Sequence, residues 1–337
     1  MNVPRKALSP ADYASDQEIR WCPGCGDFAV LAQMKKVLAK IGARRETTVF
    51  VSGIGCAARF PYYVETYGLH GIHGRAPAIA TGLKRIRPDL DVWVITGDGD
   101  GLSIGVAHLL HAMRRNTDIK ILLFNNRIYG LTKGQFSPTS EPGQVTRSTP
   151  FGLMLEPLNP LTTAIAANCS FVARAVDNQA ASLGEILERA ARHKGTAFVE
   201  IYQNCHVFND GAFDYARDNK IRADHVVELR HGEPLVFGRE HDRGLRQSGF
   251  GLEVVRLGDG ITEDDLLRHD EKMDSPALAY MLALMEHPEM PEVVGVLRDV
   301  ERPTQNELMA PGDGPDPDPG LGDLEDLLRG PESWVVE

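Results

Sequence analysis

Two short apolar runs, each followed at once by a polar turn, constrain the fold of this chain more than any other feature of its sequence. The run at 92–95 leads into Gly-Asp-Gly at 97–99, and the run at 119–124 leads into Asn-Asn at 125–126. Short runs that are apolar on both faces are typical of buried parallel strands. Because ligands of open α/β sheets bind beyond the carboxyl ends of neighbouring strands, we expect both polar turns on one rim of a sheet.

The residue types in these turns suit a metal ion that holds a diphosphate. Gly97 and Gly99 let the backbone turn sharply and approach a phosphate, and Asp98 supplies the hard oxygen ligand that Mg²⁺ prefers. With this spacing, the segment resembles the diphosphate–magnesium motif of thiamine diphosphate enzymes. The resemblance implies that Asp98, the side chain of Asn126 and the carbonyl oxygen of Ile128 bind Mg²⁺. An ordinary strand–turn–helix with a Gly-Asp turn is the alternative interpretation.

Four of the five cysteines lie in turn-like segments. Cys22 and Cys25 form a Cys-Pro-Gly-Cys pair. Cys56 follows Ser-Gly-Ile-Gly, and Cys205 comes just after an apolar run. Four thiolates can hold zinc or an iron–sulfur cluster, although a single CxxC pair also fits a thioredoxin-like dithiol. Cys169 stands in an apolar, helix-like context, so we expect a small core residue there.

These motifs together identify a resemblance to one family. The chain resembles the β subunit of 2-oxoacid:ferredoxin oxidoreductases, and among these it most resembles the members that act on 2-oxoglutarate. The motifs that carry this resemblance are CPGC near the start, GIGC before HGRA, GDGD followed by NN, and a later single cysteine. The strong motifs extend over about residues 18–235. The resemblance implies an α/β fold with a mostly parallel sheet and helices on both faces, which is the diphosphate-binding half of a thiamine diphosphate enzyme.

The cofactors implied by the resemblance are thiamine diphosphate, Mg²⁺ and one [4Fe–4S] cluster. The cluster ligands carried over are Cys22, Cys25, Cys56 and Cys205. The residues expected to contact the cofactors are Gly55, Cys56, His73, Gly74, Arg75, Gly97, Asp98, Gly99, Asp100, Asn126, Ile128, Gly130 and Leu131.

Three residues are expected to meet the substrate. In members that act on 2-oxoglutarate, basic groups near Arg59 and Lys133 meet the distal carboxylate, for which a guanidinium is well suited. His73 would polarise the substrate carbonyl or contact the diphosphate. The alternatives are that Lys133 binds a phosphate, that Arg59 pairs with an acid of another subunit, and that His73 is an ordinary core or surface histidine.

The implied reaction converts 2-oxoglutarate and coenzyme A to succinyl-CoA and CO₂, with electrons passed through the cluster to ferredoxin, and it is reversible. The chain holds one α/β domain, whereas thiamine chemistry needs a glutamate from a separate pyrimidine-binding domain. We therefore expect an α subunit in an αβ or (αβ)₂ assembly, with Glu65 as a conceivable internal substitute. Three alternatives stay open: the same reaction on pyruvate or another 2-oxoacid, a thiamine-dependent decarboxylase or lyase without ferredoxin, and a non-catalytic electron-transfer subunit.

Composition and patterning set the remaining expectations. A net charge of −11 argues against nucleic acid as a partner. No apolar run approaches a membrane span, and the N-terminus lacks the apolar core of a secretory signal, so a cytoplasmic protein is expected. The expected organisation is an arm at 1–20, the cofactor domain at 21–235 and a C-terminal extension at 236–337 with an acidic, Pro- and Gly-rich tail.

Periodicity predicts the elements of the cofactor domain. A loop rich in Gly, Pro, Ser and Thr over 130–160 is long enough to be functional rather than a simple connection. The expected strands are 48–52, 92–95, 119–124, 171–175 and 197–202, and the expected helices are 28–42, 77–85, 103–115, one beginning at 162, and 180–193.

Overall fold

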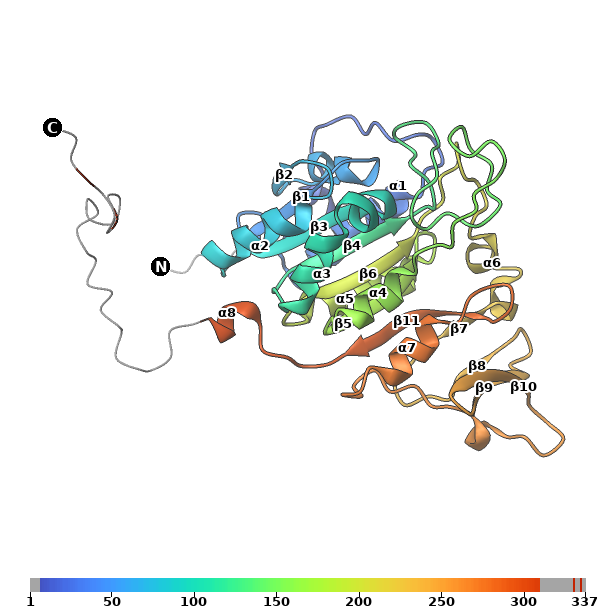
Figure 1. Cartoon of the computed structure of the whole chain (residues 1–337). Coiled ribbons are helices and arrows are strands. Elements are labelled where there is room, and N and C mark those ends of the chain that lie inside the picture. Colours follow the sequence, from blue (N-terminus) through green and yellow to red (C-terminus); the bar gives the residue numbers. More distant parts are fainter. Residues whose placement is uncertain (1–6, 310–329, 331–333, 335–337) are drawn as a thin grey trace.

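A single large sheet organises the molecule (Figure 1). The computed structural model describes residues 7–309, 330 and 334, and in this part of the chain eight strands pair in the order β2-β1-β3-β4-β6-β5-β11-β7. The acidic tail expected within 311–325 lies outside the described residues. The strands are β1 Thr48–Ser52, β2 Tyr67–His70, β3 Asp91–Gly97, β4 Lys120–Asn125, β5 Phe171–Val176, β6 Ala197–Tyr202, β7 Val226–Glu228 and β11 Glu292–Asp299.

The strands that carry the predicted motifs lie next to each other. β3 and β4 pair in parallel with Gly97 opposite Phe124. Strands β4, β5 and β6 are buried along their whole length, which explains their nearly continuous apolar sequence. Within the eight-stranded sheet of the described residues, only the pairing of β11 with β5 is antiparallel. The two polar turns therefore leave the sheet side by side, as the sequence predicted.

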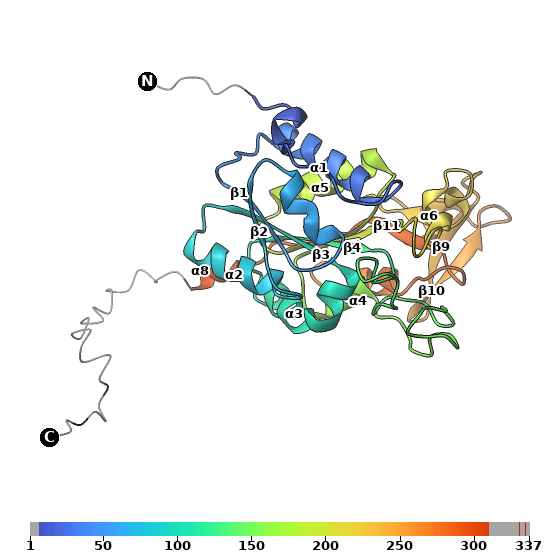
Figure 2. The same ribbon diagram turned by 90° about the horizontal axis from the view of Figure 1, so that it is seen from above.

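Helices cover both faces of the sheet (Figure 2). α1 and α5 pack on the face that buries Phe50 and Trp93. α2, α3, α4 and α7 pack on the opposite face, around Val94 and Ile121. The predicted α/β fold with helices on both faces is confirmed, and within the described residues no helix is long and apolar enough to cross a membrane. The helices are α1 Asp27–Ile41, α2 Ala76–Ile86, α3 Val106–Arg114, α4 Pro160–Ala166, α5 Ala180–Arg192, α6 Asp214–Arg217, α7 Ala277–Ala283 and α8 Gln305–Leu308.

The predicted elements are present, and two of their boundaries differ for identifiable reasons. The helix expected over 103–115 is interrupted at Ser103, whose φ of −98° and ψ of −105° are not helical, so α3 starts only at Val106. α4 starts two residues earlier than expected. The side chain of Asn159 accepts hydrogen bonds from two backbone N–H groups in the first turn of α4 and thereby fixes the start of this helix.

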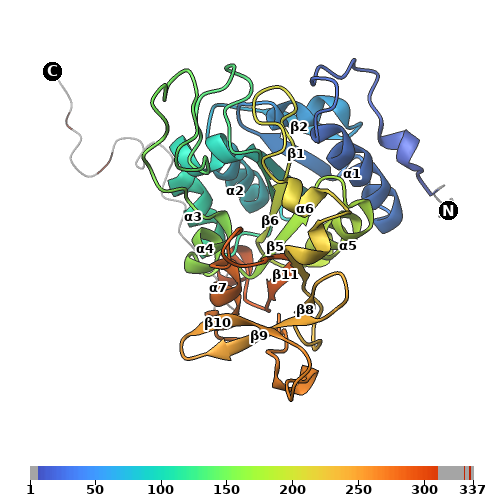
Figure 3. The same ribbon diagram turned by 90° about the vertical axis from the view of Figure 1, so that its right-hand side faces the viewer.

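The C-terminal third is not separate from the central sheet. A small antiparallel sheet lies beyond it (Figure 3), but β11 then returns and pairs with β5 on one side and β7 on the other. A boundary between residues 235 and 236 therefore does not divide the fold, because β11 covers the backbone edge of β5 that would otherwise face solvent. The small sheet consists of β8 Val236–Phe237, β9 Arg243–Ser248 and β10 Gly251–Arg256.

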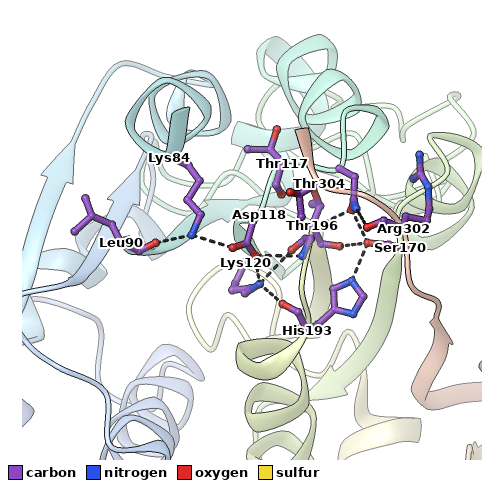
Figure 4. Close-up of polar contacts among 12 residues, drawn as sticks. Lys84, Leu90, Thr117, Asp118, Lys120, Ser170, His193, Thr196, Arg302 and Thr304 are labelled. Atoms are coloured by element: carbon purple, nitrogen blue, oxygen red, sulfur yellow. Dashed lines mark hydrogen bonds and ion pairs between the residues drawn. The ribbon is translucent and has the colours of Figure 1, made fainter. Parts of the chain in front are cut away.

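A network of polar side chains closes the amino ends of the central strands (Figure 4). The carboxylate of Asp118 pairs with the ammonium groups of Lys84 at 2.9 Å and Lys120 at 2.8 Å. Lys120 also donates hydrogen bonds to the carbonyl oxygens of His193 and Gly195. Both buried ammonium groups are thus compensated, which makes their burial tolerable.

Candidate cofactor site

The carboxyl rim of the sheet brings the two predicted turns together through a loop residue. The Thr139 hydroxyl lies 2.7 Å from Oδ2 of Asp98 and 2.9 Å from Oδ1 of Asn125. Ser137 donates a second hydroxyl hydrogen bond, 2.5 Å long, to Oδ2 of Asp98. Both residues belong to the long loop after β4, so this loop has the structural task that its length suggested. Two donors on one oxygen hold the plane of the Asp98 carboxylate in a fixed orientation.

Burial shapes the acid–base behaviour of Asp98. Its side chain is almost completely buried, and this burial raises the pKa of its carboxyl above the ordinary value. The hydroxyl groups of Ser137 and Thr139 act in the opposite direction. A carboxylate held in such surroundings gains strongly from a cation, because the ion supplies the charge that the buried site lacks.

Asp100 organises two loops that the sequence analysis placed at the cofactor. Its Oδ1 accepts hydrogen bonds from the backbone N–H groups of Ile54 at 3.0 Å and Gly74 at 2.7 Å. Its Oδ2 accepts a hydrogen bond of 2.7 Å from the Thr96 hydroxyl. Its carboxylate is engaged by groups of the chain itself, and its expected contact with the cofactor stays a prediction. It joins the segments before Cys56 and around Gly74 to the Gly-Asp-Gly turn.

His73 is oriented by the same carboxylate. Its Nδ1 lies 2.5 Å from Oδ1 of Asp100, and 37% of its side chain is exposed. Since one ring nitrogen faces Asp100, Nε2 is the nitrogen that remains to meet a ligand. Nearby, the guanidinium of Arg75 donates hydrogen bonds to the carbonyl oxygens of His73 and Ile104, so part of its hydrogen-bonding capacity is used within the chain.

Close approach explains two of the motif glycines. A Cβ on Gly99 would lie 2.3 Å from the ring of Tyr129, whose hydroxyl donates a hydrogen bond of 2.8 Å to the Gly99 carbonyl. Gly74 has a φ of +71°, and a Cβ there would lie 2.6 Å from the backbone nitrogen of Gly105. Both glycines therefore hold loops of the rim together, whether or not they touch a cofactor.

Four cysteines from three separate segments line one cavity of about 200 Å³. Cys22 and Cys25 come from the turn before α1, Cys56 from the loop after β1, and Cys205 from the segment after β6. A Cβ on Gly130 would lie 3.5 Å from Sγ of Cys56 and 3.6 Å from Sγ of Cys205, so both sulfurs face this glycine. The predicted cysteine set is thus brought together in space.

Other predicted residues reach the same cavity, and Cys169 does not. The cavity wall includes Asn126, Arg59, Leu131 and Lys133, besides the cysteines and Gly130. Arg59 also donates a hydrogen bond of 2.9 Å to the Arg20 carbonyl, and Lys133 is exposed with a φ of +75°. Cys169 is completely buried with its Sγ 3.3 Å from two carbonyl oxygens, which confirms its prediction as a core residue.

Burial makes the thiols of Cys25, Cys56 and Cys205 hard to ionise in the absence of a cation. Burial, followed by the negative charge of Asp27, raises the pKa of Cys56 to about 12. Burial and Asp27 also raise the pKa of Cys25 far above its ordinary value. Binding of a metal group would replace these protons, as metal binding to thiols does generally. Within the described ranges, no three His, Cys, Asp or Glu side chains converge closely enough to hold a single metal ion.

Three functional features were missed by the sequence analysis. Ser137 and Thr139 belong to no recognisable sequence motif, and only the length of their loop indicated a role for this segment. Tyr129 lies between the predicted residues Ile128 and Gly130, but its packing on Gly99 depends on the fold. Gln203, whose amide nitrogen lies 3.2 Å from Sγ of Cys25, gave no signal at all.

Known proteins resemble this chain over most of its length. Residues 53–201 match the family model of the thiamine pyrophosphate enzyme C-terminal TPP-binding domain. The 2-oxoglutarate oxidoreductase subunit KorB of Mycobacterium tuberculosis (strain ATCC 25618 / H37Rv) is 50% identical over 333 residues, which cover 97% of this chain and 88% of that protein. The 2-oxoglutarate synthase subunit KorB of Archaeoglobus fulgidus is 40% identical over 238 residues, which cover 68% of this chain and 89% of that protein.

A solved structure shows the same architecture. The 2-oxoglutarate:ferredoxin oxidoreductase from Magnetococcus marinus, solved with 2-oxoglutarate, coenzyme A and succinyl-CoA bound, superposes with a TM-score of 0.73. Its matching chain is 33% identical, and the match covers 91% of this chain and 90% of that one.

Proposed function

Because the chain belongs to the family of 2-oxoacid:ferredoxin oxidoreductase β subunits, we propose that it supports the oxidative decarboxylation of 2-oxoglutarate. The proposed reaction converts 2-oxoglutarate and coenzyme A to succinyl-CoA and CO₂, and two electrons leave singly through a [4Fe–4S] cluster to ferredoxin. One observation carries the proposal: four cysteines, Asn126 and the cationic residues Arg59 and Lys133 line a single cavity at the rim that also carries Asp98.

Thiamine diphosphate and Mg²⁺ are proposed to bind at the carboxyl rim. Thiamine diphosphate supplies the electron sink for the carbanion that forms when CO₂ is lost. We assign Asp98, the Asn126 side chain and the Ile128 carbonyl to the metal, because oxygen ligands of this kind suit Mg²⁺. The match to a thiamine-pyrophosphate-binding domain over 53–201, which contains all three residues, supports the assignment.

We assign the cysteine set to an iron–sulfur cluster. Four thiols from three segments of the chain line one cavity. A cluster spreads its ligand sulfurs around a larger core, and its usual ligands in proteins are four thiolates. The cluster transfers single electrons when bound, and this chain contributes Cys22, Cys25, Cys56 and Cys205 to hold it.

Substrate recognition is assigned to the cations of the cavity and to His73. Arg59 and Lys133 are proposed to bind the distal carboxylate of 2-oxoglutarate, since both line the cavity beside Asn126. His73 is proposed to present Nε2 to the substrate carbonyl while Asp100 holds the opposite ring nitrogen. An α subunit is proposed to complete the site with the pyrimidine-binding domain, and the compartment is proposed to be the cytoplasm.

The experiment is an anaerobic assay of this chain co-expressed with its α partner. It follows the reduction of a viologen dye that depends on coenzyme A, with 2-oxoglutarate and pyruvate in parallel. We expect preference for 2-oxoglutarate, and Lys133→Met should raise KM for 2-oxoglutarate about tenfold because a carboxylate contact is lost. Lys36→Met, at an exposed site on α1, is the matched control. Preference for pyruvate would refute the substrate, and no activity in a cofactor-replete preparation would refute the reaction.

A further inference from the structure

The side chain of Gln203 forms part of the wall of the cysteine cavity. Gln203 directly follows β6, is 1% exposed and lines the cavity with the four cysteines. Its Nε2 lies 3.2 Å from Sγ of Cys25 and 2.7 Å from the carbonyl oxygen of Asn204. An amide nitrogen carries two hydrogens, so it can donate to the carbonyl and to the sulfur at once.

The orientation of this amide is determined by its surroundings. If the amide were flipped, its oxygen would face the Asn204 carbonyl oxygen at the same short distance, and two acceptors would repel each other. That carbonyl is fixed independently, because it also accepts a hydrogen bond of 3.1 Å from the backbone N–H of Gly26. Asn204 is held further by a hydrogen bond of 2.9 Å from its own N–H to Oδ2 of Asp177. Nitrogen is therefore the atom that faces Cys25.

Extension of β6 does not account for a glutamine at this position. The backbone N–H of Gln203 already donates to the Asn125 carbonyl at 2.9 Å, so the side chain is not needed to extend β6. Within residues 7–309, its Oε1 is buried without a hydrogen-bond partner. A buried acceptor without a partner is unfavourable, and an apolar side chain of similar size would avoid this cost. The use of a glutamine here points to the donor function of its nitrogen.

We infer that Gln203 is a positioning residue that donates an N–H···S hydrogen bond to Cys25 and thereby raises the reduction potential of the cluster. This inference rests on the proposed function, since it requires that Cys25 is a cluster ligand. A donor to a ligand sulfur stabilises the more negative, reduced form of a cluster, so hydrogen bonds to sulfur are a principal means of tuning its potential. Gln203 touches neither substrate nor thiamine in this role, and it acts only through Cys25.

The test is a potentiometric titration of the cluster in the αβ enzyme, followed by electron paramagnetic resonance. Gln203→Met removes the donor but keeps an unbranched side chain of similar length. At the midpoint potential of the wild type, we expect the ratio of reduced to oxidised cluster to fall about tenfold, which corresponds to a shift of ~59 mV to lower potential. Gln247→Met, on β9 of the small sheet, is the matched control and should leave the potential unchanged.

The possible outcomes distinguish a failure of the role of Gln203 from a failure of the proposed function. Wild-type enzyme without a cluster signal would refute the proposed function itself. A cluster of unchanged potential in Gln203→Met would refute only the role of Gln203. If that variant loses its cluster, wild-type enzyme labelled with ¹⁵N in the glutamine side-chain amides decides the matter. Pulsed resonance should then show coupling of one amide ¹⁵N to the reduced cluster, and the absence of coupling would overturn the inference.

Discussion

The amino ends of the central strands (the amino edge) and their carboxyl ends (the carboxyl edge, or rim) both carry buried polar groups. The groups around Asp118 at the amino edge have partners, whereas among the described residues some groups at the carboxyl edge lack partners. At the amino edge, both oxygens of Asp118 are engaged by Lys84 and Lys120 (Figure 4). Burial acts to raise the pKa of Asp118, yet the two lysines hold it at about 2. At the carboxyl edge, the described part of the chain leaves Oε1 of Gln203 and Oδ2 of Asp27 buried without hydrogen-bond partners.

This contrast separates the polar groups that stabilise the fold from those that are available to bind a cofactor. Compensated charges at the amino edge stabilise the connection between strands and helices. At the carboxyl edge, buried polar atoms without partners are unfavourable, and the thiols can exchange their protons for a bound metal group. The division follows from the parallel topology of β1 to β6, which places the carboxyl ends of these strands on one rim.

The largest effect is expected from a change at the carboxyl edge. Cys56→Ser should abolish cluster binding, because a hydroxyl is a poor replacement for a thiolate ligand, and dye reduction should fall by about 10²-fold or more. Iron content and the absorbance near 400 nm measure the loss. Cys169→Ser, in the core, should retain its iron. Full iron content in Cys56→Ser would contradict the assignment of this residue.

A change at the amino edge should affect stability rather than cofactor binding. Asp118→Asn leaves the ammonium groups of Lys84 and Lys120 without their carboxylate, and we expect the free energy of unfolding to fall by about 3 kcal/mol. Denaturant unfolding measures this loss, while iron content should be unchanged. Asp89→Asn removes an exposed partner of Arg87, and its effect on the free energy of unfolding should be clearly smaller. Equal effects of the two variants would erase the contrast between buried and exposed pairs.

The loop that reaches Asp98 provides a sharper test of the carboxyl edge. Thr139→Val keeps the shape of the side chain but removes the hydroxyl that links Asp98 to Asn125. We expect the Kd for Mg²⁺ with thiamine diphosphate to rise about tenfold, as is typical when a partner of a metal ligand is lost. Titration calorimetry measures this Kd. Thr146→Val, elsewhere in the same loop, should leave it unchanged, and a similar change in both variants would argue against a specific role.

The smallest expected effect is a pH dependence that belongs to the amino edge. The folded pKa of Asp118 lies below its unfolded value, so its contribution is complete above about pH 4 and is lost as pH falls toward 2. Between pH 5 and 3 the wild type should lose roughly 1 kcal/mol of stability that Asp118→Asn does not lose. Urea unfolding at both pH values measures this difference, and parallel pH profiles would show that Asp118 is not responsible.

Much of the carboxyl edge was predictable from local sequence patterns. The apolar runs before Gly97 and Asn125 predicted neighbouring parallel strands, and the structure pairs β3 with β4. The cysteine turns predicted a shared ligand set, and the structure places all four around one cavity. Patterns of this kind are predictive because burial on both faces and sharp turns depend on a few adjacent residues.

Contacts that join distant parts of the chain were not indicated by the sequence. Asp100 accepts hydrogen bonds from loops that lie 46 and 26 residues away in sequence, and its expected contact with the cofactor stays a prediction. The C-terminal third was expected to be an extension, but β11 completes the central sheet. Neither outcome has a local signature, because the partner of a strand edge or of a carboxylate is chosen by packing.

The sequence by itself determined the α/β class, the two adjacent turns at the rim and the identity of the thiols. Only the tertiary structure decided which side chains form hydrogen bonds to these turns and thiols. Thr139 reaches Asp98 across 41 residues, and Gln203 reaches Cys25 across 178. Local patterns follow from the geometry of one strand or turn, whereas these hydrogen bonds form only after the sheet has brought separate segments together, and the donors that make them carry no pattern of their own.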